Sequence, residues 1–378
     1  MTIAALLLTG MGVALLGTIK LPLARRLEID EARVGGMISA FGFALIPVIP
    51  TAGFVTDLVG KQTVVMAGSV LMAISLGLLG RARTYPIAFL SVLLFSAAWS
   101  SLVNVINVLT PLAFPGGTTF ATNLGNVVFG VGAFVTPLAA GLVLRRTGLS
   151  VALGVLACLA ALPAVLALGV DFPVASATSG PSASVEAGAD AGFATLIGDR
   201  AMWLFAFVLF FYGPLEASMA GWATTYLRDQ GVSETRASSL LSVFWLIFMM
   251  ARLVTALTAR LIAGHEAVFV FVLALASTLV LSVLYMGRGR AVAVGVVCAA
   301  GVSFGPVFPT LMAMLLNHFP PTLHGRAVGL LFGIGGVGWT TIPMLMGAYA
   351  RRSSVQRAFA IAIASALGLC VVTAVLAL

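Results

Sequence analysis

The chain has 378 residues, of which 61% are hydrophobic and only 8% are charged, and its formal net charge is +8. Soluble domains carry roughly 25% charged residues, and a soluble fold could not bury the apolar surface that a mean hydropathy of +1.13 implies. The positive charge does not indicate nucleic-acid binding either, because the basic residues lie in short loops between apolar runs, where they mark headgroup contacts and membrane topology.

Apolar segments long enough to cross a bilayer, at about 20 residues each, follow one another along the chain. They lie near residues 2–22, 34–56, 62–80, 86–110, 118–143 and 149–170, and then near 201–227, 237–262, 267–286, 291–316, 325–349 and 356–378. The first segment lacks the basic start and the cleavage site of a signal peptide, so we expect it to be a spanning helix. The sequence therefore predicts an all-α membrane protein with twelve transmembrane helices.

The only polar, low-complexity stretch separates the first six segments from the last six. Residues 171–198 are rich in Ala, Ser and Gly, and such a segment cannot bury enough surface to fold, so we expect a flexible tether. This predicts an N-terminal six-helix half over residues 1–170, a cytoplasmic linker over 171–198 and a C-terminal six-helix half over 199–378.

Two sequence echoes relate the halves to each other. Gly130–Gly141 reads GVGAFVTPLAAG and Gly336–Gly347, 206 residues later, reads GVGWTTIPMLMG. Residues 31–39 and 234–242 share a second pattern at an offset of 203. An internal repeat of this size predicts two pseudo-symmetric bundles, which is how many secondary transporters are built around a central site.

The loop between the second and third segments reads Gly53-Phe-Val-Thr-Asp57-Leu-Val-Gly60-Lys61. It resembles the G-x-x-x-D-x-x-G-[RK] signature of the major facilitator superfamily, whose fold of two six-helix halves would cover the whole chain. The resemblance implies a cytoplasmic loop in which Asp57 caps and pairs with a neighbouring helix end and holds the outward-open state together. Gly53 and Gly60 would allow the tight turn, and Lys61 would steady the loop.

Two further stretches, Phe211–Leu227 (FYGPLEASMAGWATTYL) and Gly301–Pro309 (GVSFGPVFP), are similar to the fucose/galactose/glucose–proton symporter branch of that family. Residues 136–141 resemble the Gly-Pro-x-x-Gly-Gly motif of proton-driven antiporters, but two of its glycines are replaced, which counts against an antiporter. Pro137 and its repeat counterpart Pro343 each remove one backbone hydrogen bond, so both are predicted helix bends.

Glu216 lies in the middle of the seventh segment, with Tyr212 one turn before it. Charged residues in the middle of a spanning helix are costly and usually functional. Burial disfavours the charged form of a carboxyl group, so Glu216 is predicted to take up and release a proton, as proton coupling requires. The alternative is a structural carboxyl group paired to a neighbouring helix.

Arg252 lies in the middle of the eighth segment, where a guanidinium stays charged and needs a partner. The possible partners are Glu216, a substrate anion and backbone carbonyl groups. A substrate anion and Glu216 are equally good partners, and they could alternate during transport; a structural pair is the remaining reading. Lys20 is close enough to a helix end to reach the headgroups. If it faces a cavity instead, it and Arg252 would favour an anionic solute over a neutral sugar.

Uncharged groups complete the predicted site. Asparagine pairs one turn apart offer donors and acceptors, although such amides also link helices, and aromatic rings could stack on a sugar or an apolar body. Trp222 could instead belong to the interfacial aromatic belt. The predicted substrate-binding residues are Arg252, Lys20, Asn104, Asn107, Asn123, Asn126, Tyr212, Trp222, Trp245 and Trp339. The histidines in the loop before the eleventh segment, His318 and His324, are expected to be solvated.

These features predict a secondary active transporter that moves a small polar solute, a sugar or a small organic anion, by proton-coupled symport and alternating access. A proton-driven exporter of amphipathic compounds is the alternative, and a transport-dead receptor or scaffold is a third hypothesis. The sequence carries no enzyme constellation, metal-spaced His/Cys set or phosphate-binding loop, so we expect no enzyme activity, metal or cofactor. We expect a monomer in the cell (inner) membrane.

The arginine distribution opposes the orientation that the family resemblance implies. With both termini and the linker in the cytoplasm, the loops that face outside would carry most of the arginines, which reverses the positive-inside rule. The outside residues would be Arg25, Arg26, Arg33, Arg81, Arg83, Arg145, Arg146, Arg288, Arg290, Arg351, Arg352 and Arg357, against Lys61, Arg200, Arg260 and Arg326 inside. We keep the family orientation because its loop motif has a mechanical role.

Overall fold

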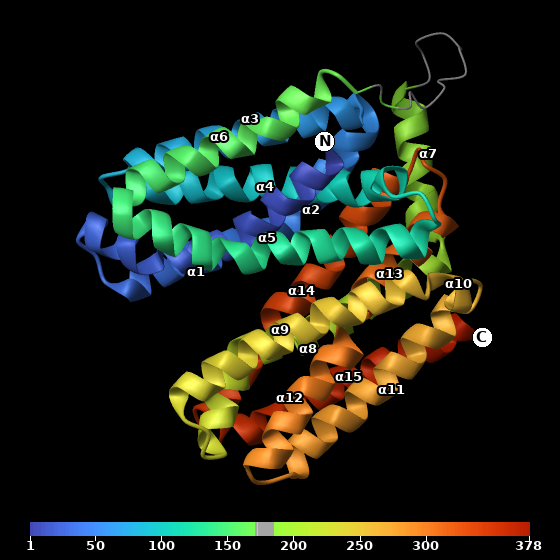
Figure 1. The fold of residues 1–378 in the computed structure, drawn as a ribbon. Helices are drawn as coiled ribbons and strands as arrows, with labels where there is room; N and C mark the ends of the chain where they lie inside the picture. The colour runs from blue at the N-terminus through green and yellow to red at the C-terminus, as the bar shows by residue number, and fades with distance from the viewer. Residues whose placement is uncertain (171, 173–184) are drawn as a thin grey trace. The chain divides into compact units, whose positions relative to one another are not determined.

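The computed structural model of the chain describes residues 1–170, 172 and 185–378, and every regular element among them is a helix (Figure 1). The N-terminal helices are α1 (Thr2–Leu27), α2 (Glu31–Val59), α3 (Lys61–Arg81), α4 (Tyr85–Ala113), α5 (Thr118–Thr147) and α6 (Leu149–Ala167). After α7 (Val185–Gly198) come α8 (Arg200–Asp229), α9 (Glu234–Leu257), α10 (Ala259–Ile262), α11 (Glu266–Met286), α12 (Arg290–Phe304), α13 (Val307–His318), α14 (His324–Ala350) and α15 (Val355–Ala377).

Helices long and apolar enough to span a membrane number 12 in the described residues, six before α7 and six after it. This confirms the expectation of an all-α membrane protein with twelve spans in two bundles. The tenth span, Arg290–His318, differs from the expected continuous helix, because α12 ends at Phe304 and α13 begins at Val307. The helices α5 and α14 continue through Pro137 and Pro343, and bends at these prolines remain a prediction.

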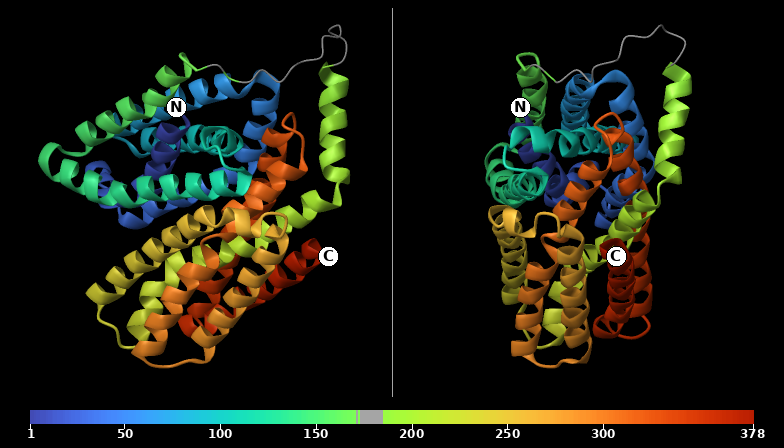
Figure 2. Two further views of the ribbon diagram at one scale, coloured as in Figure 1. Left: turned by 45° about the vertical axis from the view of Figure 1, so that its right-hand side comes forward. Right: turned by 90° about the vertical axis from the view of Figure 1, so that its right-hand side faces the viewer.

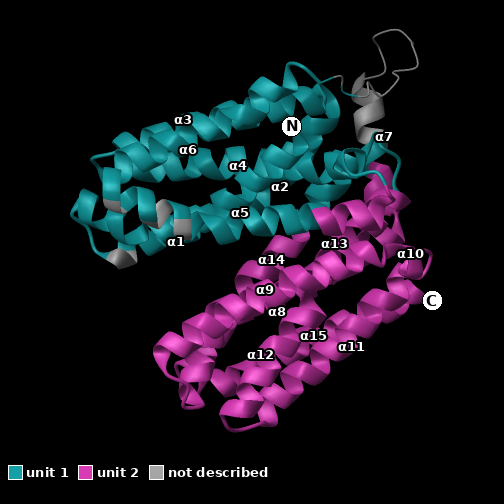
Figure 3. Ribbon diagram, viewed as in Figure 1, with its two compact units in different colours: residues 1–115, 125–193, 319–333 teal, residues 116–124, 194–318, 334–378 magenta. Residues whose placement is uncertain are grey.

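The described chain divides into two compact units, and each takes the first turns of one helix from the other half of the sequence (Figure 3). Unit 1 contains residues 1–115, 125–193 and 319–333, and unit 2 contains residues 116–124, 194–318 and 334–378. Residues 185–198, inside the segment expected to be a flexible tether, form α7. Residues 171 and 173–184 of that segment lie outside the described part of the chain.

The two units use the same packing pattern, which is the structural form of the sequence repeat (Figures 1 and 2). In unit 1, α3 packs against α4 and α6, α2 against α4, and α1 against α2, α4 and α6. In unit 2, α11 packs against α12 and α15, α9 against α12, and α8 against α9, α12 and α15. In the second pattern the places of α1, α2, α3, α4 and α6 are taken, in the same chain order, by α8, α9, α11, α12 and α15. The two bundles are therefore pseudo-symmetric.

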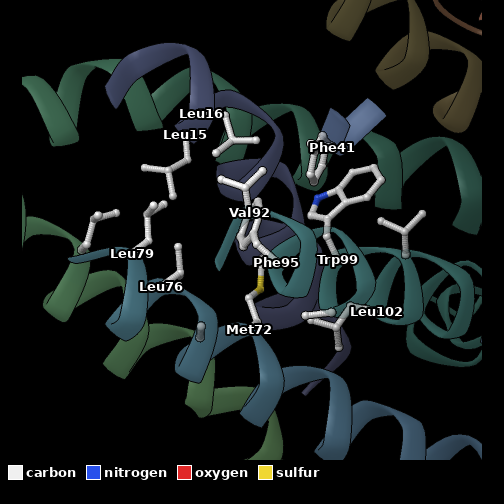
Figure 4. Close-up of a cluster of buried hydrophobic side chains, with 14 of the residues drawn as sticks. Leu15, Leu16, Phe41, Met72, Leu76, Leu79, Val92, Phe95, Trp99 and Leu102 are labelled. Carbon is white, nitrogen blue, oxygen red and sulfur yellow. The ribbon is translucent and has the colours of Figure 1, made fainter. Parts of the chain in front are cut away.

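An aromatic cluster lies at the centre of unit 1 (Figure 4). The ring centroids of Phe95 and Trp99, both on α4, lie 5.7 Å from that of Phe41 on α2. The indole nitrogen of Trp99 donates a hydrogen bond of 2.8 Å to the carbonyl oxygen of Thr9 on α1, so a polar atom that lipid could not satisfy finds a partner. This cluster joins α1, α2 and α4, and Met72 extends it to α3.

The repeated Gly-Val-Gly motifs let two helix pairs approach at backbone distance. A Cβ atom on Gly132 of α5 would overlap the carbonyl oxygen of Leu7 on α1, and a Cβ atom on Gly338 of α14 would overlap that of Phe210 on α8. Only a residue without a side chain fits such a contact. The second glycine of each motif therefore sets the distance between equivalent helices in the two units.

Alanine at Gly132 or Gly338 should destabilise the protein by about 1–3 kcal/mol, because the overlapping atom is backbone and cannot rotate away. Gly154 on α6 is a matched control, since a Cβ atom there meets nothing within 4 Å. Alanine at Gly154 should be neutral or stabilising by up to about 1 kcal/mol, because glycine is a poor helix former. Thermal unfolding of the three purified variants in detergent measures the difference. Equal shifts in all three would contradict the close-contact explanation.

Candidate functional site

Tyr212 and Glu216 lie one turn apart on α8 and share a hydrogen bond within unit 2. The Tyr212 hydroxyl donates to Oε2 of Glu216 over 2.9 Å. The Tyr212 side chain is fully buried, whereas Glu216 is half-buried. The spacing noted in the sequence is consistent with this contact, because residues four apart on a helix face the same side. The carboxyl group is thus fixed in direction while part of its surface stays accessible.

Arg252 on α9 is buried beside this pair. Its Nε donates to the carbonyl oxygen of Gly305 over 2.8 Å, and its Cζ lies 4.3 Å from the ring centroid of Phe248. The guanidinium also acts electrostatically on Glu216 and Tyr212. The three side chains therefore form one cluster, which we call the Glu216 cluster, at the packing of α8 and α9.

The predicted tryptophans of unit 2 lie in different surroundings. Trp245 is half-buried, with its ring centroid 5.3 Å from that of Phe248, so it joins the aromatic group beside Arg252. Trp339 on α14 is partly exposed and packs over Gly213 on α8, where a Cβ atom would lie 2.8 Å from its ring. Trp222 is half-buried near Gly347 of α14. Only Trp245 is in contact with a ring that touches the Glu216 cluster.

The four predicted asparagines do not act as two pairs. In unit 1, Nδ2 of Asn104 donates to the carbonyl oxygen of Gly325 over 3.0 Å, whereas Nδ2 of Asn107 donates to Val103 of its own helix over 2.8 Å. In unit 2, Nδ2 of Asn123 donates to the Thr119 carbonyl over 3.0 Å and approaches Oγ1 of Thr310 at 3.4 Å. The remaining candidates of unit 1, Asn126 on α5 and Lys20 on α1, are half-buried.

Asn104 and Asn123 each keep a buried Oδ1 atom for which the described residues provide no hydrogen-bond partner. A buried amide oxygen without a partner is costly. Each of these atoms could accept a hydrogen bond from a water molecule or a solute hydroxyl group. Among the described residues, no group of three or more His, Cys, Asp or Glu side chains could hold a metal ion.

Asp57 caps the first turn of α14 within unit 1. Its Oδ1 accepts from the backbone N–H of Gly325 and its Oδ2 from that of Arg326, both over 2.9 Å. Nε of Arg326 lies 3.7 Å from Oδ2, and its Cζ lies 4.8 Å from the ring centroid of Phe54. A helix N-terminus carries unsatisfied N–H groups and a partial positive charge, so it attracts a carboxylate.

Small residues make this cap possible. A Cβ atom on Gly53 would overlap the Gly325 carbonyl oxygen, and one on Gly325 would lie 2.5 Å from Oδ1 of Asp57. Gly60 has a φ of 89°, a left-handed conformation that favours glycine, and lets α2 end directly before Lys61 begins α3. Gly53 and Asp57 thus lie in the last turns of α2 and not in a loop, and of the two glycines only Gly60 makes the expected turn. The sequence also did not identify the partner of Asp57, the first turn of α14.

The sequence feature that could have indicated this contact is a set of regularly spaced glycines at the start of α14. Gly325, Gly329 and Gly333 are spaced by four residues, so they share one helix face. Cβ atoms on Gly329 and Gly333 would lie 3.0 Å and 2.6 Å from atoms of Pro50 on α2. Small residues at this spacing let membrane helices cross closely. The start of α14 therefore rests on α2 along three turns.

His318 is exposed, as expected, and it also pairs with Asp199 at 3.1 Å between Nε2 and Oδ2. Its ring also packs against Phe205, with centroids 5.8 Å apart. Asp199 caps α8, since its Oδ1 accepts from the N–H groups of Ala201 and Met202 over 2.7 Å and 3.2 Å. Burial raises the pKa of Asp199, but the hydrogen bonds from His318, Met202 and Ala201 outweigh it and lower the pKa below the ordinary value.

Replacing Asp199 with Ala should lower the free energy of unfolding by about 1 kcal/mol at neutral pH, because a helix cap is lost. A carboxyl group with a lowered pKa contributes stability that is fully present above its unfolded pKa of about 3.9 and is lost as the pH falls below that value. The deficit of Asp199→Ala should therefore shrink as the pH falls from 5 towards 3. Serine, which also caps, should retain most of the stability. A deficit independent of pH, measured by thermal unfolding in detergent, would contradict this account.

Comparison with known proteins gives one family. A family model described as the Major Facilitator Superfamily matches residues 2–343. "Bypass of stop codon protein 6" of Saccharomyces cerevisiae is 27% identical over 177 residues, a match that covers 44% of this chain and 36% of that protein. The matched region thus spans only about a third of this curated relative.

Solved structures share the fold over nearly the whole chain. The fucose:proton symporter FucP of E. coli is similar with a TM-score of 0.81 and 16% identity, covering 99% of this chain and 97% of the other. The human organic anion transporter MFSD10 has a TM-score of 0.77 at 16% identity, covering 98% and 99%. The proton:xylose symporter XylE has a TM-score of 0.76 at 12% identity, covering 98% and 93%. At these identities the likeness shows the fold alone.

Proposed function

Because this chain belongs to the major facilitator superfamily, and is therefore a multi-pass membrane transporter and not an enzyme, we propose that it moves a small polar solute by proton-coupled symport. The solute would be a sugar or a small organic anion. Alternating access would come from two bundles that change their arrangement around a central site. Structures with this fold belong to sugar:proton symporters and to an organic anion transporter, and both solute classes are consistent with the groups present.

The observation that carries the proposal is the Glu216 cluster. Its carboxyl group is half-buried, held by Tyr212 and faced by the charge of Arg252. An ionisable group inside a membrane span is costly, so its presence in the middle of α8 indicates a role in transport. A half-buried carboxyl group opposite a fixed positive charge can exist in both protonation states, and this is what a proton-coupling site needs.

Each unit offers hydrogen-bonding, charged or aromatic groups that could bind such a solute. Asn104 and Asn123 have buried acceptor atoms, Lys20 and Arg252 supply positive charge, and Trp245 offers a ring beside the Glu216 cluster. Tyr212, Asn107, Asn126, Trp222 and Trp339 remain further candidates. Arg252 already has a carbonyl partner and an aromatic face.

Asp57 would act as the latch of one gate. Its two hydrogen bonds to the start of α14 join residues that are 268 and 269 positions apart in the chain. Breaking that cap would free the first turn of α14 from α2. We place this gate, with Gly53, Gly60 and Lys61, on the cytoplasmic side of the cell membrane, and we expect a monomer. A cysteine within residues 173–184, in a chain without Cys158, Cys298 and Cys370, should be labelled by an impermeant reagent only from the cytoplasmic side.

The experiment that tests the function measures proton entry into proteoliposomes containing the purified protein. Sugars and small carboxylates would be added one at a time, with protein-free liposomes as the control. We expect one solute class to trigger proton influx, which would establish symport and identify the substrate class. No influx with any solute would contradict proton symport and leave the export of amphipathic compounds to be tested.

A further inference from the structure

The tenth span contains two prolines that leave backbone carbonyl groups without helical partners. In a continuous helix the carbonyl of Gly305 would accept from the N–H of residue 309, but Pro309 has none, and Pro306 likewise leaves the carbonyl of Val302 without its usual donor. The helix is interrupted there, between Phe304 and Val307. An unsatisfied carbonyl inside a membrane is costly, so a break at this depth needs another donor.

Arg252 supplies that donor for Gly305. Its Nε donates to the Gly305 carbonyl over 2.8 Å, and the guanidinium is covered by the ring of Phe248. A side chain at position 305 would prevent this approach, because a Cβ atom there would lie 2.5 Å from the backbone oxygen of Phe248. Gly301, one turn earlier, also lies close to α9, where its Cβ atom would be 2.9 Å from the oxygen of Phe244. The break therefore rests directly on the backbone of α9.

The same guanidinium faces the proton site. Arg252 from α9 and Tyr212 from α8 itself are the groups that act on Glu216. The other helices that pack on α8 (α12, α13, α14 and α15) contribute no ionisable side chain that acts on Glu216 among the described residues. The position of the Arg252 side chain thus depends both on the carboxyl group of Glu216 and on the carbonyl group of Gly305.

We propose that Arg252 is a positioning residue that transmits the charge state of Glu216 to the break between α12 and α13. A charged Glu216 attracts the guanidinium and weakens its hydrogen bond to Gly305, whereas a neutral Glu216 leaves that bond intact. The break would then loosen and tighten as Glu216 loses and gains a proton. This inference rests on the proposed function only in taking Glu216 as the group that titrates.

Hydrogen–deuterium exchange of the full-length protein in nanodiscs tests the proposal without any solute. The readout is the protection factor of peptides that cover residues 300–312, followed from pH 5 to pH 8 and corrected for the intrinsic exchange rate. In the wild type we expect protection to fall about tenfold with rising pH. When Glu216 becomes charged, the hydrogen bond from Arg252 to the Gly305 carbonyl weakens, and the backbone around the break opens more often. Glu216→Gln should keep the peptides protected at every pH.

Variants of Arg252 separate transmission from simple stabilisation. Arg252→Gln should exchange about tenfold faster than the protonated wild type, with no pH dependence. Adding Pro309→Ala returns the missing N–H to Gly305, so the double variant should regain protection but not the pH dependence. Arg252→Lys keeps the charge without the guanidinium geometry, and it should also lose the pH dependence. This variant replaces Arg252→Gln in the test if the glutamine variant does not fold. Arg260→Gln, an exposed arginine just after α9, is the matched control and should behave like the wild type.

The outcomes distinguish this inference from the proposed function. If the pH dependence persists in Arg252→Gln or Arg252→Lys, Arg252 does not transmit the charge and the inference is wrong, whatever Glu216 does. If the pH dependence persists in Glu216→Gln, Glu216 is not the titrating group, and its role as the proton carrier fails as well. The inference would also be overturned if, in the wild type, the protection of the peptides that cover residues 300–312 did not change with pH.

Discussion

Replacing Glu216 with Gln should abolish solute-driven proton influx, with a loss of at least about 100-fold, the contribution typical of a positioned proton-transfer group. Glutamine has the same shape and can still accept a hydrogen bond from Tyr212, which donates to the carboxyl group in the wild type. It cannot bind or release a proton. The measurement is the rate of proton entry into proteoliposomes with the solute that the wild type transports.

The same variant should still exchange labelled solute across the membrane when both sides contain it. Exchange needs the two bundles to change access but needs no net proton movement, so it separates loss of coupling from loss of folding. Glu234→Gln provides a matched control, because Glu234 is exposed at the start of α9, and it should leave influx unchanged. Proton influx that survives in Glu216→Gln would remove Glu216 from this role.

The fold could be predicted because its determinants are local in sequence. Each span is recognisable from about 20 apolar residues, and the repeat at offsets of 203 and 206 indicated two equivalent bundles. The Tyr212–Glu216 contact was also predictable, since helix geometry alone brings residues four apart together. In each case the spacing along the chain was sufficient.

The partners of Asp57, Asn104 and Arg252 could not be predicted in the same way. Asn104 meets Gly325 across 221 positions and Arg252 meets Gly305 across 53. In both contacts one partner is a backbone carbonyl, which leaves no side-chain signal in the sequence. The break in the tenth span was missed for a related reason, because hydropathy reports an apolar run and does not report which of its carbonyl groups lack a donor.

The repeat also conceals a difference between the two units. Where unit 1 has the carboxylate of Asp57 on the backbone N–H groups at the start of α14, the start of α5 is held in unit 2 by the hydroxyl groups of two threonines. Thr118 donates to Asn317 over 2.7 Å, and Thr119 approaches Glu266 at 3.3 Å. Hydrogen bonds between such exposed or partly buried groups contribute little compared with a buried carboxylate on a helix N-terminus. Of these two contacts, the one between Asp57 and the start of α14 therefore depends more on a single residue.

Replacing Asp57 with Ala should lower the free energy of unfolding by about 3 kcal/mol, because two N–H groups of the first turn of α14 and the charge of Arg326 lose their buried partner. The two bonds of 2.9 Å should matter more than the 3.7 Å approach of Arg326, which is too long for a hydrogen bond. Arg326→Gln should therefore cost less than Asp57→Ala. Asparagine at position 57 should not rescue the cap, because its amide NH₂ group is itself a donor and would face one of the two backbone N–H groups of α14.

Asp30→Ala is the matched control for Asp57→Ala, since Asp30 also caps a helix, with its Oδ1 accepting from the N–H of Arg33 over 2.7 Å at an exposed position. It should cost only about 1 kcal/mol. Thermal unfolding in detergent compares the two, and solute exchange in proteoliposomes shows whether loss of the cap also changes the rate at which access alternates. If Asp57→Ala is no less stable than Asp30→Ala, the contact between Asp57 and α14 does not hold these helices together, and the latch assigned to Asp57 must lie elsewhere.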